Sequence, residues 1–308
     1  YGNQGGHSGG GANAGAFEKG NIMMMKMMKQ NKRIAQAAPL LALLIPCGIG
    51  SIAMLCNQLP AVTCALNIGA VIVFGGLAIG LSRIKGKPSS VLLLAIGIGL
   101  LLLTFAEKGA ENVHRWINLG GVSLHASMLA VPCCLAALQA LLTKQQSIFA
   151  YLGMLCIGSI LFLQPDASQL TGFTLGCAVL LFAKKPHSWV DYFTLLCLMI
   201  LSVLSFFRLD QLEAVAHVEG ILQLVKEIHP LLMGIGIVSL ILVPIPFLFL
   251  SKGHMRTVSL AYGLYFEAMI VFSAFGHFPV PMMGFGVSPI VGFCMLYAWL
   301  LREPAIGE

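Results

Sequence analysis

The chain has 308 residues, of which 58% are hydrophobic and only 10% are charged, and its mean hydropathy is +0.89. A water-soluble protein of this size needs a larger polar surface, so the composition excludes a soluble enzyme. The net charge of +6 does not indicate nucleic-acid binding, because the Lys and Arg residues flank the apolar segments.

Residues 1–33 precede the first apolar segment and are expected to lie outside the membrane. Residues 1–17 are rich in glycine and poor in large apolar side chains, which predicts a disordered tail. Residues 22–33 alternate methionine clusters with basic residues. This segment fits two interpretations: a stretch that lies on the inner leaflet with its cations toward anionic headgroups, or a solvated basic flank.

Ten apolar segments follow, and each predicts a membrane-spanning helix. They lie at residues 34–56, 60–82, 89–106, 125–143, 147–164, 168–183, 188–207, 230–251, 257–276 and 284–301. The sequence therefore predicts an all-α, polytopic membrane domain of about ten helices over residues 34–308. Pro244 and Pro246 are expected to kink the eighth helix.

The distribution of basic residues predicts the orientation of these helices. If the N-terminus is cytoplasmic, fourteen of the eighteen Lys and Arg residues fall on the cytoplasmic side. The loops on the opposite side hold seven of the twelve acids. The positive-inside rule then places both termini in the cytoplasm, with the two long outer loops at residues 107–124 and 208–229.

The nine cysteines lie in or beside hydrophobic runs and lack the paired spacing of a zinc site. We interpret them as packing residues and predict no metal centre. Two acids fall within predicted spans, where a carboxylate is costly. Asp191, near the inner end of the seventh span, is expected to contact Lys184 or Lys185. For Glu267, a helix-packing hydrogen bond and a proton or substrate site both remain open.

The first outer loop places Arg115 directly before Trp116. A guanidinium beside an interfacial indole is suited to a phosphate-bearing lipid, because it combines a bidentate cation with an aromatic anchor. The alternative is an arginine that snorkels to the interface beside an ordinary interfacial tryptophan.

The second outer loop has an apolar periodicity that predicts an amphipathic helix over residues 210–227, lying on the outer surface. Apolar residues recur there at steps of three and four: Leu212, Val215, Val218, Leu222 and Val225. Glu219 shares the apolar side, and partial desolvation suits its carboxylate to take a proton from a hydroxyl as a general base. The alternative is an acid at the edge of the helix, paired with a cation such as Lys226.

Four segments resemble motifs of the SEDS family, the polytopic FtsW/RodA/SpoVE proteins of bacterial cell division and cell shape. The run at residues 115–120 resembles its R-W-I-x-L-G motif, and residues 164–166 resemble its Q-P-D motif. Residues 217–222 resemble H-T-D-F-I-F, and residues 279–288 resemble the G-x-P-L-P-F-I-S-Y-G-G-S stretch before the last helix. All four occur in the order of the family.

The resemblance implies a SEDS-like protein of the bacterial inner membrane that binds a polyprenyl-diphosphate sugar, such as lipid II, beside a single-span transpeptidase. It implies peptidoglycan glycosyltransferase activity, in which Arg115 holds the diphosphate and Glu219 deprotonates the attacking 4-hydroxyl. The other residues that it implies at the substrate site are Trp116, Ser127, Gln164, Asp166 and His217. A divalent cation could assist the leaving diphosphate, but the sequence shows no cluster of ligands dedicated to it.

The chain also departs from the family pattern. The family reads Q-P-S-E-x-x-K after its Arg-Trp motif, whereas residues 125–131 keep only the serine, Ser127, and lack the Glu and Lys. Glu219 stands where the family has Asp. These differences favour the alternative function, a non-catalytic membrane scaffold or lipid-binding partner of an envelope-assembly complex. On the sequence, whether the chain is an enzyme stays open.

Overall fold

The computed structural model describes residues 36–302, except 85, 87, 107, 110, 112, 121 and 145. The predicted tail at 1–17 and the basic segment at 22–33 lie outside the described residues. The chain divides into two compact units, Tyr1–Ala38 and Pro39–Glu308. Of the first unit only residues 36–38 are described, as helix, so the predicted boundary near residue 33 stays a prediction.

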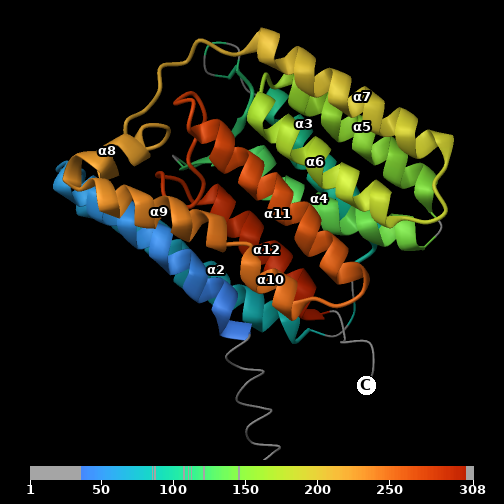
Figure 1. The fold of residues 1–308 in the computed structure, drawn as a ribbon, viewed down its shortest axis with the longest axis horizontal. Helices are drawn as coiled ribbons and strands as arrows, with labels where there is room; N and C mark the ends of the chain where they lie inside the picture. The colour runs from blue at the N-terminus through green and yellow to red at the C-terminus, as the bar shows by residue number, and fades with distance from the viewer. Residues whose placement is uncertain are drawn as a thin grey trace, which may run out of the picture. The chain divides into compact units, whose positions relative to one another are not determined.

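The described chain is mainly helical (Figure 1). Two single turns of 3-10 helix, Thr104–Ala106 and Phe206–Arg208, extend α3 and α7. The helices in chain order are Gln36–Cys56, α2 (Ala61–Ser82), α3 (Ser90–Leu103), α4 (Ala126–Thr143), α5 (Ser147–Leu163), α6 (Ala167–Ala183), α7 (Trp189–Ser205), α8 (Ile221–Ile228), α9 (Pro230–Leu242), α10 (Ile245–Leu250), α11 (His254–Ser273) and α12 (Ser288–Arg302).

This architecture is that of a helical membrane protein. Within the part of the chain that the structure describes, five helices are long and apolar enough to cross a bilayer, and four further apolar helices are shorter. The five are Gln36–Cys56, Ala61–Ser82, Ala126–Thr143, Trp189–Arg208 and Pro230–Phe249. The number of ten membrane spans therefore stays a prediction, as does the orientation of the helices.

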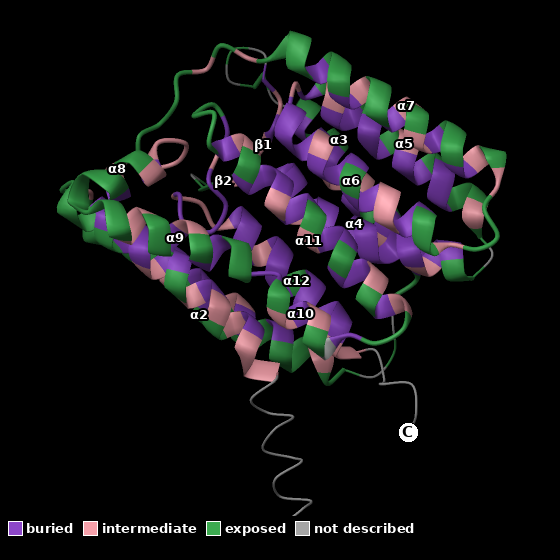
Figure 2. Ribbon diagram, in the orientation of Figure 1, coloured by how far each residue is buried: buried purple, intermediate pink, exposed green. Residues whose placement is uncertain are grey.

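Helix α4 forms the centre of the helical unit. It packs against α3, α5, α6, α11 and α12, and 89% of the residues in its apolar stretch are buried. In the apolar stretches of α2 and α7 only 33% and 28% of the residues are buried. Figure 2 shows exposed residues along α7. Apolar residues that are exposed in this way are expected on helices that face lipid. The predicted kink at Pro244 and Pro246 is confirmed, because the helix is interrupted between Leu242 and Ile245.

A β-hairpin interrupts the predicted all-α fold just before α4. Strands β1 (Trp116–Leu119) and β2 (Val122–His125) are antiparallel, and Trp116 is paired with His125. At the turn Gly120 has a φ of 58°, a left-handed conformation that glycine adopts at little cost. The hairpin lies in the predicted outer loop at residues 107–124, except for its last residue, and each strand is only four residues long. The fold class stays all-α, as predicted.

The predicted amphipathic helix at 210–227 was also wrong over most of its length. Only Ile221–Ile228 is helical, as α8, and residues 209–220 form an irregular loop that we call the Glu219 loop. The backbone of this loop bonds elsewhere in the chain: Phe285 donates to the carbonyl of His217 (2.7 Å), and Val280 donates to that of Val218 (3.3 Å). Carbonyls that accept these long-range bonds are not used in a continuous helix.

Candidate functional site

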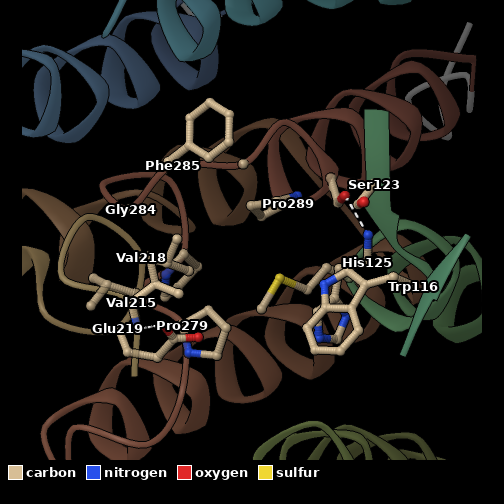
Figure 3. Close-up of a pocket in the computed structure, with 15 residues that line it drawn as sticks. Trp116, Ser123, His125, Val215, Val218, Glu219, Pro279, Gly284, Phe285 and Pro289 are labelled. Carbon is tan, nitrogen blue, oxygen red and sulfur yellow. Dashed lines mark hydrogen bonds between the residues drawn. The ribbon is translucent and has the colours of Figure 1, made fainter. Parts of the chain in front are cut away.

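A cavity of about 240 Å³ lies where the hairpin, the Glu219 loop and the segment before α12 meet (Figure 3). The residues that line it are Trp116, Ser123, His125, Met128, Val215, Val218, Glu219, Pro279, Val280, Pro281, Gly284, Phe285, Gly286, Ser288 and Pro289. Pockets for drug-sized ligands are usually about 300–1,000 Å³. The cavity therefore accommodates part of a large ligand, such as one sugar or one phosphate group.

The wall contributed by residues 279–289 is held by a buried asparagine of α2. The Asn67 amide donates to the carbonyl of Gly284 (2.8 Å) and accepts from the backbone of Gly286 (3.3 Å). A Cβ at Gly284 would come within 2.6 Å of the Val218 carbonyl. Glycine is required here because two backbone segments approach this closely. The fourth family-like segment therefore lies against the third.

Glu219 lines the cavity at the end opposite to Trp116 and His125 (Figure 3). Its Oε2 accepts a hydrogen bond from the backbone of Val215 (2.8 Å), and the residue is half-buried. This bond holds the carboxylate in place beside the cavity. It occupies one acceptor position, and a carboxylate has further acceptor positions that remain for a ligand. Glu219 can therefore accept a proton from a group in the cavity.

His125 lies at the other end of the cavity and is almost completely buried. Its backbone donates to the hydroxyl of Ser288 (2.8 Å), its Nδ1 lies 3.0 Å from the Ser127 hydroxyl, and its Nε2 lies 3.5 Å from Asp166 Oδ2. The ring also packs edge-on against Trp116, with centroids 5.8 Å apart.

The charge state of His125 is set by its surroundings. It lies in β2, one residue before the candidate span that begins at Ala126. Burial lowers the pKa of His125 from 6.5 to about 4, the Asp166 carboxylate opposes this shift, and the Arg115 guanidinium adds to it. The imidazole is therefore neutral at pH 7 and presents a polar, uncharged group to the cavity.

Arg115 is buried in a layer behind the cavity wall. Its Nε donates to the Gln164 carbonyl (3.3 Å) and lies 3.8 Å from Asp166 Oδ2. Its Nη2 donates to the Pro165 carbonyl and to the carboxylate of Asp210. We call Arg115, His125, Asp166 and Asp210 the hairpin cluster. The cluster brings together residues up to 95 positions apart in the chain.

The other predicted site residues also lie in this second layer. The Gln164 amide donates to the Leu101 carbonyl (3.1 Å) and to the Thr104 hydroxyl (2.9 Å), and Asp166 caps α6 through the backbone of Gln169 (3.3 Å). Ser127 is fully buried. The predicted site residues that line the cavity are Trp116 and Glu219, and the rest support the wall.

The ring of His217, the remaining predicted site residue, packs against that of Phe285, with centroids 5.7 Å apart. The sequence prediction of the site missed His125, Asp210 and Ser288. A signal existed for Ser288, because it lies within a family-like segment, and for His125, because it stands two residues before Ser127, which the family pattern shares. Asp210 lies outside these segments, and only its three-dimensional contact with Arg115 identifies it.

The described residues include no group of three or more His, Cys, Asp or Glu side chains that could hold a metal ion. The residues at the cavity therefore do not fit a dedicated divalent-cation site, and no chemical step is assigned to one. Six of the nine cysteines are buried, as expected for packing residues.

No protein-family model matches the chain. The chain is similar to the probable peptidoglycan glycosyltransferase FtsW of Coxiella burnetii (strain RSA 493 / Nine Mile phase I), with 30% identity over 144 residues. The match covers 42% of this chain and 39% of that protein, so the chain spans about two fifths of this relative's length. Together with the apolar helices, this similarity supports a bacterial membrane protein with a distant SEDS-like relationship.

Proposed function

We propose that this protein is a SEDS-like glycosyltransferase of the bacterial inner membrane that polymerises a polyprenyl-diphosphate-linked sugar of the lipid II type. The observation that carries the proposal is the cavity between Glu219 and the Trp116–His125 pair. Three of the four family-like segments contribute residues to its lining: 115–120, 217–222 and 279–288. The remaining segment, residues 164–166, lies directly behind the cavity, where Asp166 is close to His125.

In this proposal Glu219 is the general base. Its carboxylate takes the proton of the acceptor sugar's 4-hydroxyl as that oxygen attacks the anomeric carbon of the donor sugar. A new glycosidic bond forms, the bond between the anomeric carbon and the diphosphate breaks, and the polyprenyl diphosphate leaves with the bonding electrons. A base must lie within hydrogen-bond reach of the hydroxyl, and the Val215 bond holds the Glu219 carboxylate at the cavity for this purpose.

Trp116 supplies an aromatic face for a sugar ring, and neutral His125 supplies a polar contact at the far end of the cavity. Because the cavity holds only part of such a substrate, the polyprenyl chain extends into the bilayer. The sequence also predicts that Arg115 holds the diphosphate, which requires a guanidinium with donors free to face the ligand. In the structure the Nε and Nη2 atoms of Arg115 donate to protein acceptors, which supports a different role considered below.

A second candidate function is a non-catalytic scaffold that binds the lipid or a partner, such as a single-span transpeptidase. The observation that favours it is the apolar character of the cavity wall where the family carries Glu and Lys. Met128 lines the cavity, and Val131 is fully buried. Neither side chain can bind a diphosphate or transfer a proton.

Polymer formation by Glu219→Gln separates the two functions. If the protein is an enzyme, purified Glu219→Gln should lose polymer formation from labelled lipid II by roughly 100-fold or more, because the amide keeps the shape but not the basicity. Binding of the lipid should remain nearly unchanged. Glu213→Gln, an exposed acid of the same loop, is the matched control and should polymerise normally. Wild-type amounts of polymer from Glu219→Gln would end the proposed mechanism.

A further inference from the structure

The Glu219 loop is attached to the rest of the protein at its two ends by different kinds of interaction. At the far end, His217 and Val218 accept hydrogen bonds from the backbone of the segment before α12. These bonds do not depend on side-chain identity. At the near end, the Asp210 side chain pairs with Arg115, and two residues earlier Arg208 lies over the ring of Phe162, 4.7 Å from its centroid.

Asp210 uses its two carboxylate oxygens for two separate tasks. Its Oδ2 accepts from Arg115 Nη2, and its Oδ1 accepts from the backbone of Leu212 (3.1 Å). The first contact ties the loop to the hairpin, and the second sets the direction in which the chain leaves it. An Asx-type bond of this kind fixes the conformation of the residues that follow. Because the ion pair fixes the Asp210 side chain, it also orients residues 211 and 212.

Arg115 is itself held firmly enough to serve as an anchor. Its side chain is only 5% exposed, and that of Asp210 is 12% exposed. The carbonyls of Gln164 and Pro165 orient the guanidinium toward Asp210. A charge-assisted pair in such a site is stronger than a surface ion pair, because water does not screen it.

The loop between the two attachments is short and exposed. Residues 213–216 are exposed, and Glu219 follows directly after the far attachment at Val218. The Val215 backbone, which donates to the Glu219 carboxylate, lies between the two attachments. The Val215 carbonyl also accepts from the backbone of Val218 (2.9 Å), Glu219 (3.0 Å) and Gly220 (3.2 Å), so residues 215–220 form one turn that carries the carboxylate. Movement of the near end would tilt this turn and shift the carboxylate from its position at the cavity.

We infer that Arg115 and Asp210 are positioning residues, whose ion pair holds the near end of the Glu219 loop and so places the Glu219 carboxylate at the cavity. The inference rests on the proposed function for the role of Glu219, but the attachment of the loop can be measured without it. Arg115 then acts through the loop and not through direct contact with the diphosphate.

Hydrogen exchange of the full-length protein in lipid nanodiscs tests the attachment. Asp210→Asn keeps an acceptor for Leu212 but loses the ion pair, so the hydrogen-bonded amides of Leu212, Val215 and Val218 should exchange at least about tenfold faster. Arg115→Lys should have a similar effect, because an ammonium cannot reproduce the planar arrangement in which Nε and Nη2 reach Asp210 and the two carbonyls together. Peptides from α4 should be unchanged, which shows that the variants are folded, and Glu213→Gln is the matched control.

Steady-state kinetics with lipid II then test the positioning. In Asp210→Asn, kcat for polymer formation should fall with little change in KM, because Trp116 and His125 still line the cavity and only the base is displaced. Unchanged exchange in both variants would overturn the inference. A loosened loop with normal kcat would overturn the positioning role. If wild-type protein makes no polymer, the proposed function fails, while the exchange result still decides whether the ion pair holds the loop.

Discussion

The hairpin cluster and a second charged cluster at the start of α7 use the same kinds of group but are assembled differently. The α7 cluster consists of Tyr151, Lys184, Ser188 and Asp191. Three of its four members lie within eight residues of one another, and Ser188 and Asp191 form a capping box. The hairpin cluster joins residues from three distant parts of the chain.

The clusters also differ in what remains when the cation is lost. In the α7 cluster, Asp191 keeps hydrogen bonds from the Tyr151 hydroxyl (2.6 Å) and from the backbone of Ser188 (2.6 Å). In the hairpin cluster, Arg115 serves two carboxylates and two carbonyls at once. The Oδ1 atoms of Asp166 and Asp210 keep bonds from the backbone of Gln169 and Leu212, but both Oδ2 atoms lose the same cation. Loss of Arg115 therefore affects two carboxylates, whereas loss of Lys184 affects one.

The largest effect is expected from removing the cation of each cluster. Arg115→Met should lower the free energy of unfolding by about 3–5 kcal/mol, because Asp166 and Asp210 lose their shared partner within the protein. Lys184→Met should cost only about 1 kcal/mol, because the Lys184 side chain is 19% exposed and Asp191 keeps other donors.

Thermal unfolding of both variants in one detergent measures this difference. Equal losses of stability would contradict the distinction between the clusters. A larger loss from Lys184→Met would reverse it and assign the greater structural role to the α7 cluster.

The contrast explains which parts of the site could be predicted. The contact of Asp191 with Lys184 was predicted from sequence and is confirmed (3.0 Å), because both residues lie at adjoining helix ends. The contact of Arg115 with Asp210 was not predicted, because no periodicity relates residues that are 95 positions apart. The resemblance to the SEDS family marked Arg115, Gln164 and Asp166, but it did not indicate that they contact one another.

The same reasoning applies to the fold. Long apolar runs predicted helices such as α2, α4 and α5 to within a few residues, since hydrophobicity and length are local properties. The hairpin was missed because each of its strands is only four residues long, too short for a clear alternating pattern. The Glu219 loop was missed because its backbone bonds involve distant partners, namely the bonds that residues 217 and 218 accept from Phe285 and Val280. In the loop, these long-range backbone bonds replace the helical bonds that the apolar periodicity predicted.

The next expected effect concerns acid, because the hairpin cluster contains His125. Its pKa is about 4 in the folded protein and 6.5 ordinarily, so between these pH values the unfolded chain binds a proton that the folded protein does not. Stability should therefore fall as pH is lowered from about 6.5 to 4. The contribution of this residue is at most ~3 kcal/mol.

His125→Gln is the control for this pH dependence. It places at residue 125 the amide that the SEDS pattern carries there and removes the titrating group. Unfolding temperatures measured between pH 7 and 4 should decline less steeply in the variant than in the wild type. Parallel curves would show that His125 does not contribute to acid sensitivity.

The smallest effect is expected from the cap of α7. Ser188 accepts from the backbone at the third helical position, and its hydroxyl also donates to Asp191 (2.9 Å). Ser188→Ala removes both contacts but leaves the Lys184 ion pair and the Tyr151 bond, so the loss of stability should be about 1 kcal/mol. Ser188→Thr keeps a hydroxyl in the cap and should recover most of it. Because the remaining donors still hold Asp191 in place, neither variant should change polymer formation or hydrogen exchange in the Glu219 loop. A change in that loop would mean that the two clusters are coupled through the helices between them. Their separate contacts instead imply that each cluster is stabilised independently of the other.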